Sequence, residues 1–173
     1  MKKTAILLCL LTALLCSCSH KSEGDATPLA YVRMPMTVEA AISCEAGDGR
    51  VVIDYTDTTH YTVRYTEPAV MQGVCYERDG GDAYLCFGDS RIPVTNGDAC
   101  LGSLAAARLL IPDGATLRTE QKDGQVKICK FEADGMTSQI TLDEAGLPVQ
   151  VKGEADGFGA TLTQLTVSYG QSQ

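Results

Sequence analysis

The sequence predicts a mainly β domain of the α+β class, built as a strongly bent antiparallel sheet or half barrel of about ten strands. Apolar and polar residues alternate along short segments, and turns rich in Gly and Asp separate these segments. One stretch near residues 98–111 has helical spacing instead, which predicts a single covering helix. A long meander with one apolar face must curl to bury that face, so the helix is expected to close the concave side.

Composition supports one globular domain and excludes a class of function. The chain has 173 residues, of which 45% are hydrophobic and 21% are charged, and this length is typical of a single domain. It carries 14 basic and 22 acidic residues, a formal net charge of −8. Nucleic-acid binding depends on cationic contacts to phosphate, so no nucleic-acid partner is expected.

Residues 1–17 have the organisation of a secretory signal peptide. Lys2 and Lys3 form a positive start, and Thr4–Cys16 is apolar apart from two threonines. This run is shorter than the roughly 18 residues that a spanning helix needs. A buried core helix is disfavoured, because the run is apolar on all sides and leads directly into a polar stretch.

The leader ends in Leu15-Cys16-Ser17-Cys18, which resembles the lipobox of bacterial lipoproteins. The resemblance implies cleavage after Ser17 and a thioether-linked diacylglycerol on Cys18. Cys16 fits less well, because a small residue is expected before the acceptor. Two or three acyl chains hold a protein stably at a membrane. We therefore expect an extracytoplasmic protein of the bacterial cell envelope, with the membrane as its partner through the lipid anchor.

Residues 18–28 are expected to form a flexible tether, and residues 29–173 a single folded domain. Cleavage of the leader removes two lysines and leaves 12 of the 14 basic residues against 22 acidic ones, a net charge of −10. Because an acidic domain is not attracted to anionic lipid, attachment must come from the acyl chains.

Alternation from Val38 to Cys44 predicts the first strand, with its apolar side chains on one face. The next two strands carry Val51, Ile53 and Tyr55, and Tyr61, Val63 and Tyr65, respectively. Pairing Ile53 with Val63 across the intervening turn brings all six side chains onto the same face.

Asp79-Gly80-Gly81-Asp82 predicts a tight hairpin, because Gly-Gly supplies the positive φ of a two-residue loop. The resulting register pairs Val74 with Phe87, Tyr76 with Leu85, and Cys75 with Cys86. The two cysteines lie on the opposite face from the apolar pairs and are a disulfide candidate. Free thiols are the equal alternative, since a hydrogen-bonded pair holds its side chains farther apart than the alternate pairs.

Helical spacing of Leu104 and Leu109 predicts the one helix, over Asp98–Ile111. Asp98 can cap its first turn, and Pro112-Asp113-Gly114 ends it. Hairpins are expected to resume afterwards.

Near the C-terminus, a four-residue turn at Asp143–Gly146 places Ile140 against Val149. The last strand is expected to place Val167 on one face of the sheet and Leu162 on the other.

Tyr61–Pro68, followed by Val70–Val74 and a short hairpin, resembles the strand, Pro, apolar-x-Gly passage of LolA-like lipoproteins. The helix, the later hairpins and Gly146-Leu147-Pro148 with Val151 continue the resemblance, which covers approximately residues 30–170. It implies a highly bent antiparallel sheet with helices over its concave side, and some members carry acyl chains of lipids or lipoproteins there. The chain departs from the periplasmic carriers, which are soluble, have more helices and begin with one.

The apolar face and this resemblance together predict a ligand cavity for an acyl chain or another apolar small molecule. Its candidate lining is the inward row of four strands: Tyr55, Tyr61, Val63, Tyr65, Val74, Tyr76, Leu85 and Phe87. The simpler interpretation is an ordinary half-buried core in a chain that has no Trp and three Phe.

The sequence contains no motif for catalysis, metals or cofactors, and none of these is expected. There is no Cys-x-x-Cys, no phosphate loop and no calcium loop. His60 is the one histidine outside the tether and lies at an expected hairpin end, which is typical of a solvated turn residue. The acidic residues cluster in turns, where turn chemistry accounts for them.

The expected function is a membrane-anchored, non-catalytic binding module that holds an apolar ligand in its concave face. The alternative is a surface protein-interaction or envelope-stress sensing module with a packed, ligand-free core. The sequence identifies no protein partner.

Overall fold

The computed structural model describes residues 29–45, 47–95 and 101–170. The first half contains β1 (Met36–Cys44), β2 (Gly47–Tyr55), β3 (His60–Glu67), the 3-10 helix η1 (Ala69–Met71), β4 (Val74–Asp79), β5 (Asp82–Phe87) and β6 (Ser90–Pro93). Helix α2 (Leu101–Leu110) follows. The second half contains β7 (Thr116–Asp123), β8 (Val126–Ala133), β9 (Met136–Leu142), β10 (Pro148–Ala155) and β11 (Phe158–Tyr169).

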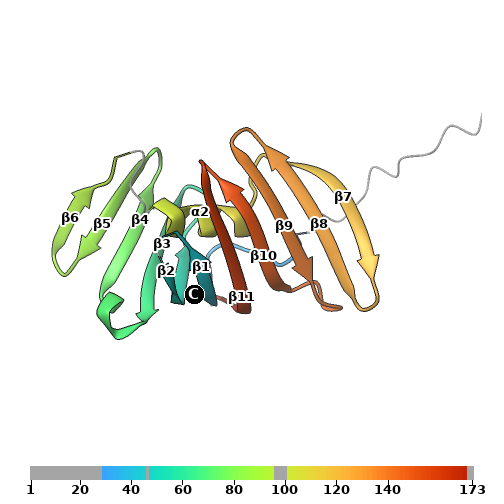
Figure 1. Cartoon of the computed structure of the whole chain (residues 1–173), viewed down its shortest axis with the longest axis horizontal. Coiled ribbons are helices and arrows are strands. Elements are labelled where there is room, and N and C mark those ends of the chain that lie inside the picture. Colours follow the sequence, from blue (N-terminus) through green and yellow to red (C-terminus); the bar gives the residue numbers. More distant parts are fainter. Residues whose placement is uncertain (1–28, 46, 96–100, 171–173) are drawn as a thin grey trace, which may run out of the picture.

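The strands of the described residues form one 11-stranded sheet in the order β6-β5-β4-β3-β2-β1-β11-β10-β9-β8-β7. β1 and β11 pair antiparallel at its centre, so the two halves of the chain form two meanders that diverge from this seam. The sheet bends into a trough and does not close into a barrel, because β6 and β7 are its outermost strands (Figure 1). The predicted fold class is confirmed, with 11 strands where about ten were expected.

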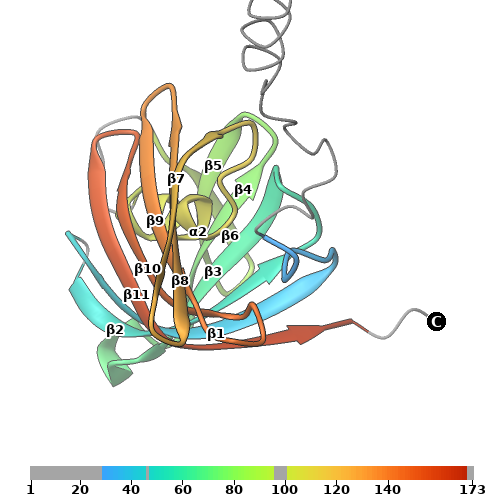
Figure 2. The ribbon, with the colours of Figure 1, turned by 90° about the vertical axis from the view of Figure 1, so that its right-hand side faces the viewer.

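Helix α2 lies in the trough because of the route that the chain must take. β6 and β7 follow one another along the chain but lie at opposite edges of the sheet, so their connection crosses the concave side. Figure 2 shows α2 surrounded by the curved sheet. The helix contacts β9, β10 and β11 of one meander and β1, β3 and β4 of the other. Of the predicted helix 98–111, residues 98–100 lie outside the described residues.

The composition of α2 matches its buried position. Of its described side chains, that of Arg108 alone is not buried. A surface helix has a polar face, whereas a helix that is apolar on all sides belongs in a core. The core therefore consists of α2 and the inward strand faces, including Val38, Ile53, Val63, Ile140 and Val151. Within the described residues, no helix has the length and apolar character needed to cross a bilayer.

Two registers set by tight turns are as predicted. Ile53 pairs with Val63 across the β2–β3 turn, and Cys75 pairs with Cys86 across the β4–β5 loop. A short loop of fixed geometry leaves its two strands one favourable way to pair.

The predicted register of β9 and β10 is wrong for two reasons. Leu142 pairs with Pro148, so the turn is one residue longer than expected, and the ladder shifts by one more residue between Pro148 and Gln150. Ile140 therefore pairs with Val151 and not with Val149. The shift moves Val149 out of the inward row and leaves it 40% exposed.

The predicted split of β11 into two faces is also wrong. Leu162 and Val167 both lie on the inward face, opposite Ile42 and Val38 of β1. The register shifts between them, and Gln164 adopts a left-handed conformation with φ 53°. One extra residue in the strand returns the later side chains to the same face.

Strand β10 passes very close to β9 at Gly153. A Cβ atom at this position would lie 1.9 Å from the carbonyl oxygen of Thr137, so a side chain requires the backbone to move. A glycine at such a point lets two strands approach where the sheet bends.

Candidate functional site

Hydroxyl groups from two strands and from the segment before β1 satisfy backbone carbonyls at the end of α2. The last four carbonyl groups of an α-helix have no partner within the helix, and burying them unpaired is unfavourable. Tyr55 donates to the carbonyl of Ala107, and Ser138 to that of Leu109, each at 2.7 Å. Tyr31 donates to the carbonyl of the last residue of α2. These three contacts fix where the helix lies.

Two more tyrosines contact the earlier turns of α2. The hydroxyl oxygen of Tyr65 lies 3.0 Å from Oγ of Ser103, and Tyr61 donates to the carbonyl of Leu104 at 3.4 Å. Burial raises the pKa of all four tyrosines that contact the helix above the ordinary value. Their hydroxyl groups therefore keep their protons, which these hydrogen bonds need.

The predicted cavity lining divides into two groups. The buried members are Tyr55, Tyr61, Val63, Tyr65 and Tyr76. Val74 and Leu85 are partly buried, and Phe87 is 62% exposed near the edge of the sheet. The buried group belongs to the core around α2. A ligand-binding role for these residues stays a prediction.

A hollow of about 760 Å³, here called the mouth pocket, opens beside α2. Three hairpin turns border it together with the helix and the loop that follows. Its lining is Thr58, Thr59, Tyr61, Arg78, Gly80, Gly81, Leu104, Ala105, Arg108, Ile111, Asp113, Asp156 and Phe158. Ligand pockets commonly measure about 300–1,000 Å³, so the volume is sufficient for a small ligand.

The apolar part of the mouth pocket consists of side chains that are packed into the core. Tyr61, Leu104, Ala105 and Ile111 are all buried, and three of them belong to α2 or directly follow it. Phe158, at the start of β11, is partly buried and packs against the core. These side chains give the pocket a preformed apolar surface.

Polar contacts tie the elements around the mouth pocket together. Arg108 of α2 forms an ion pair with Asp156 in the β10–β11 turn. Thr58, in the β2–β3 turn, donates to Oδ2 of Asp113 at 3.1 Å. The helix and its following loop are thus joined to one turn of each meander.

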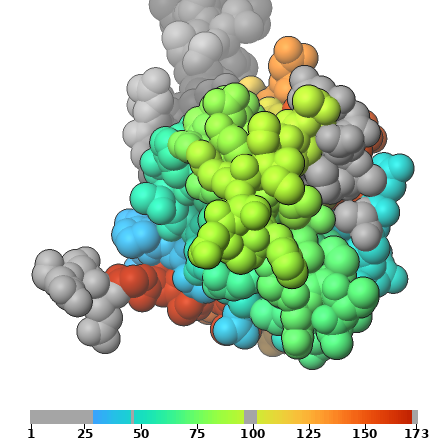
Figure 3. All heavy atoms as spheres, turned by 90° about the vertical axis from the view of Figure 1, so that its left-hand side faces the viewer, coloured from blue at the N-terminus to red at the C-terminus, as the bar shows by residue number. Residues whose placement is uncertain are grey.

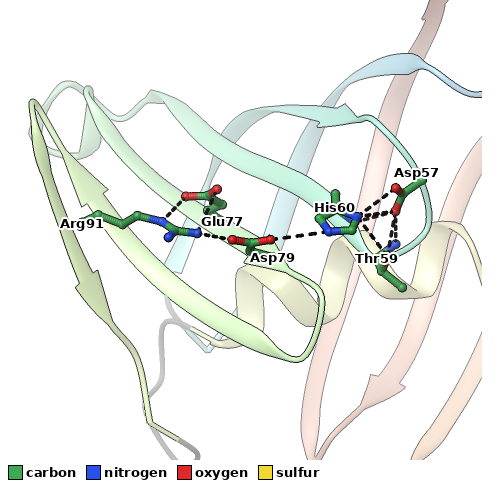
Figure 4. A network of polar contacts seen from close by, with 6 residues as sticks. All are labelled: Asp57, Thr59, His60, Glu77, Asp79 and Arg91. Atoms are coloured by element: carbon green, nitrogen blue, oxygen red, sulfur yellow. Dashed lines mark hydrogen bonds and ion pairs between the residues drawn. The ribbon is translucent and has the colours of Figure 1, made fainter.

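A charged network on the outer face of the first meander stabilises one of these turns (Figure 4). Arg91 lies 2.9 Å from Glu77 and 2.7 Å from Asp79, and Asp79 lies 3.5 Å from Nε2 of His60. Nδ1 of His60 lies 2.8 Å from Asp57. Strands β4 to β6 form the surface that faces the viewer in Figure 3. His60 is about half exposed, as expected for a solvated turn residue.

Asp57 organises the β2–β3 turn beside the mouth pocket. Its Oδ1 accepts hydrogen bonds from the backbone N–H groups of Thr59 at 2.7 Å and His60 at 2.8 Å. The bonds from Thr59 are the main cause that lowers the pKa of Asp57 to about 2, and the bonds from His60 add to it. The ionised carboxylate therefore positions Thr58 and Thr59, which line the pocket.

The described cysteines are free thiols. Cys75 and Cys86 lie directly opposite one another, and the disulfide between them stays a prediction. Cys129 is buried and Cys44 is partly buried. Cys18 lies outside the described residues, so its lipidation stays a prediction as well.

A second hollow, of about 660 Å³, lies elsewhere on the sheet. Its lining is Ser43, Cys44, Lys130, Phe131, Glu132, Thr137, Ser138, Gln139, Lys152, Gly153, Gly159, Ala160 and Thr161. Most of its side chains alternate with the inward row and therefore lie on the outer face of the sheet, although Phe131 and Ala160 add buried apolar side chains to it. The described residues contain no group of three or more His, Cys, Asp or Glu placed to hold a metal ion.

Four charged residues line the mouth pocket and were not predicted as site residues: Arg78, Arg108, Asp113 and Asp156. Arg78 carried a usable signal, because the two-residue period that places Val74 and Tyr76 inward continues to it. No sequence pattern indicated Arg108 or Asp156, since their ion pair depends on how α2 packs against a hairpin that is distant in the chain.

Comparisons with known proteins find similarity among solved structures. A LolA superfamily protein from Nitrosomonas europaea has a TM-score of 0.46 and 11% identity, over 84% of this chain and 92% of that chain. An uncharacterized conserved protein from Thermus thermophilus has a TM-score of 0.42 and 9% identity, over 80% of this chain and 82% of that chain. These likenesses concern the general course of the chain and not its chemistry. No protein-family model and no curated protein matches the sequence.

Proposed function

We propose that this protein is a non-catalytic binding module of the bacterial cell envelope, anchored to a membrane through lipid on Cys18, that holds an acyl chain or another apolar ligand. The mouth pocket carries the proposal, because about 760 Å³ of space lies against buried apolar side chains of α2. Small-ligand sites are concave and combine apolar surface with polar groups that orient the ligand, and the mouth pocket offers both an apolar wall and charged side chains. The sequence resemblance to LolA-like lipoproteins favours the same class of ligand.

The expected anchor would keep the mouth pocket close to a source of acyl chains. The tether, residues 18–28, has 11 residues. An extended chain spans at most about 3.5 Å per residue, so the tether reaches about 40 Å. A ligand that leaves the bilayer is then within reach of the domain.

The packing of α2 favours a second candidate function, a surface protein-interaction or envelope-stress sensing module. The helix fills much of the trough, and the outer face carries the charged network from Arg91 to Asp57. In this case no lipid enters, and a protein partner contacts the outer face.

Photo-crosslinking of the full chain in isolated membranes tests the first proposal. The probes are a sixteen-carbon fatty acid and fatty alcohol that carry a diazirine, added after isolation so that neither is built into the anchor. We expect saturable labelling that excess palmitate displaces. Gly81→Trp should weaken labelling at least about fivefold, because Gly81 borders the mouth pocket and has open space for a side chain.

Gly159→Trp is the matched control. Gly159 pairs with Glu154 on the outer face, and a Cβ atom there meets its nearest neighbour at 3.9 Å. This variant should be labelled like the wild-type protein. Labelling that does not saturate would reject the binding function, and saturable labelling that is equal in all three proteins would reject the mouth pocket as the binding site. A stable protein partner together with unsaturable labelling would select the second candidate.

A further inference from the structure

We propose that the ligand of the mouth pocket is an anionic amphiphile whose carboxylate or phosphate group is bound by Arg78. This inference rests on the proposed function and adds the chemistry of the ligand's head group. It is carried by one juxtaposition, a guanidinium group that forms no ion pair with any described carboxylate and lies beside a buried apolar surface.

The register places Arg78 on the inward face of the sheet. Arg78 pairs directly with Tyr61 of β3 and with Ala83 of β5, and both of these are buried. Side chains of directly opposed residues lie on the same face of a sheet. Arg78 is only partly exposed and lines the mouth pocket, so its charge is presented to the pocket and not to the outer face.

Arg78 forms no ion pair among the described residues, although the domain is acidic. Its neighbours along β4, Glu77 and Asp79, lie on the outer face and pair there with Arg91. The alternation of the strand keeps these carboxylates away from Arg78.

The carboxylates that line the mouth pocket are engaged by other groups. Asp156 pairs with Arg108, and Asp113 accepts a hydrogen bond from Thr58. Because the Thr58 hydroxyl is neutral, Asp113 keeps its charge, and Arg78 is the pocket's one guanidinium group without an ion pair to a described carboxylate. A partly desolvated cation of this kind favours an anionic ligand.

The charge of Arg78 acts on the apolar part of the pocket. Burial raises the pKa of Tyr61, whereas the positive charges of Arg78 and Arg108 oppose this rise and the negative charge of Asp156 adds to it. Arg78 thus contributes a positive potential at the Tyr61 ring, next to Leu104 and Ile111. An acyl chain on these side chains would carry its head group within reach of that charge.

The chemistry of arginine explains why both head groups qualify. A guanidinium group presents a planar fork of donors that matches the two oxygens of a carboxylate or of a phosphate. A neutral alcohol or ester of the same chain length offers no negative charge to this fork. The preference for an acid over an alcohol therefore measures the contribution of Arg78.

The experiment compares three diazirine probes of equal chain length on the full chain in isolated membranes: the carboxylic acid, the monoalkyl phosphate and the alcohol. We expect half-saturation at an about tenfold lower concentration for at least one anionic probe than for the alcohol. Arg78→Gln should remove this difference and leave the alcohol unchanged, whereas Arg78→Lys should retain part of it. Arg64→Gln is the matched control, because Arg64 pairs with Asp54 on the outer face.

The outcomes separate the two proposals. A preference for the acid alone identifies a fatty-acid head group, and a preference for the phosphate alone identifies a phospholipid-type head group. Equal half-saturation for all three probes in the wild-type protein overturns the role of Arg78 and leaves the binding function standing. Loss of saturable labelling for every probe rejects the binding function itself. The wild-type comparison needs no variant, so a poorly folding Arg78→Gln does not affect it.

Discussion

The hydroxyl group of Tyr55 donates a hydrogen bond to the carbonyl oxygen of Ala107, 2.7 Å away and 52 residues later in the chain. Ser138 makes the equivalent bond to Leu109 from the second meander. The end of α2 is therefore held by both halves of the sheet. Its position depends on buried polar contacts as well as on apolar packing.

Tyr55→Phe is expected to lower the free energy of unfolding by about 1–3 kcal/mol, because the carbonyl of Ala107 loses its partner while buried. Chemical denaturation of the purified chain measures this. Tyr84→Phe is the control, since the Tyr84 ring lies against Arg91 on the outer face. It should change stability by less than about 0.5 kcal/mol. Equal effects of the two substitutions would contradict the capping role of Tyr55.

Gly153→Ala is expected to destabilise the fold by more than about 3 kcal/mol or to prevent folding. The new Cβ atom would lie 1.9 Å from the carbonyl oxygen of Thr137, which is part of a paired strand. Gly159→Ala, with its nearest neighbour at 3.9 Å, should be tolerated. Thermal unfolding compares the two, and a Gly153→Ala protein as stable as the wild type would refute the close approach of β9 and β10.

Asp57 is expected to contribute to the acid sensitivity of the fold. Hydrogen bonds from Thr59, and then from His60, lower the pKa of its carboxyl group to about 2. Unfolded aspartate titrates near pH 4, so the stabilisation is complete above about pH 4 and is lost as the pH falls through about 2. Asp57→Asn should flatten the decrease in melting temperature over this range.

Asp134→Asn, in another turn, is the control for this experiment and should follow the wild-type curve. Melting temperatures recorded between about pH 2 and pH 5 provide the comparison. Three parallel curves would show that Asp57 makes no contribution.

Oxidation is expected to link Cys75 to Cys86. Directly opposed residues of an antiparallel pair have Cα atoms about 4.5–5.5 Å apart, which lies within the range for disulfides. Burial raises the pKa of both thiols, so linking should accelerate as the pH rises above the ordinary thiol range. Peptide mass mapping after mild oxidation measures the link. Cys86→Ser provides the control, and a preferred link from Cys75 to any other cysteine would contradict the prediction.

The sequence predicts strand pairing well where a turn has a defined chemistry. Gly80-Gly81 leaves one favourable register, and Cys75 accordingly faces Cys86. Around Val149 and Gln164 the same reasoning fails. In β11 a bulge adds one residue without a compositional signal and places Val167 on the same face as Leu162. In β10 a longer turn and a bulge shift the register by two residues, so Val149 leaves the inward row while Val151 stays in it.

The mouth pocket could be predicted only in part. Tyr61 follows from the apolar alternation, and Arg78 lies on the same inward period. The remaining lining comes from three hairpin turns, the start of β11, α2 and the loop that follows α2, which meet through packing between distant segments. The alternation of apolar and polar residues within one segment does not indicate which distant segments pack against it.

Helix α2 is part of the segment that connects the two edge strands, β6 and β7. The distance between these strands is therefore linked to the helix content of that segment. The ten residues of α2 span about 15 Å as a helix and about 33 Å when extended, so each residue that unwinds adds almost 2 Å of reach. Once the rest of the segment between β6 and β7 is fully extended, these two edge strands can move farther apart only if α2 loses helical turns. A state of this protein in which the sheet has opened would therefore show a weaker helical signal in circular dichroism.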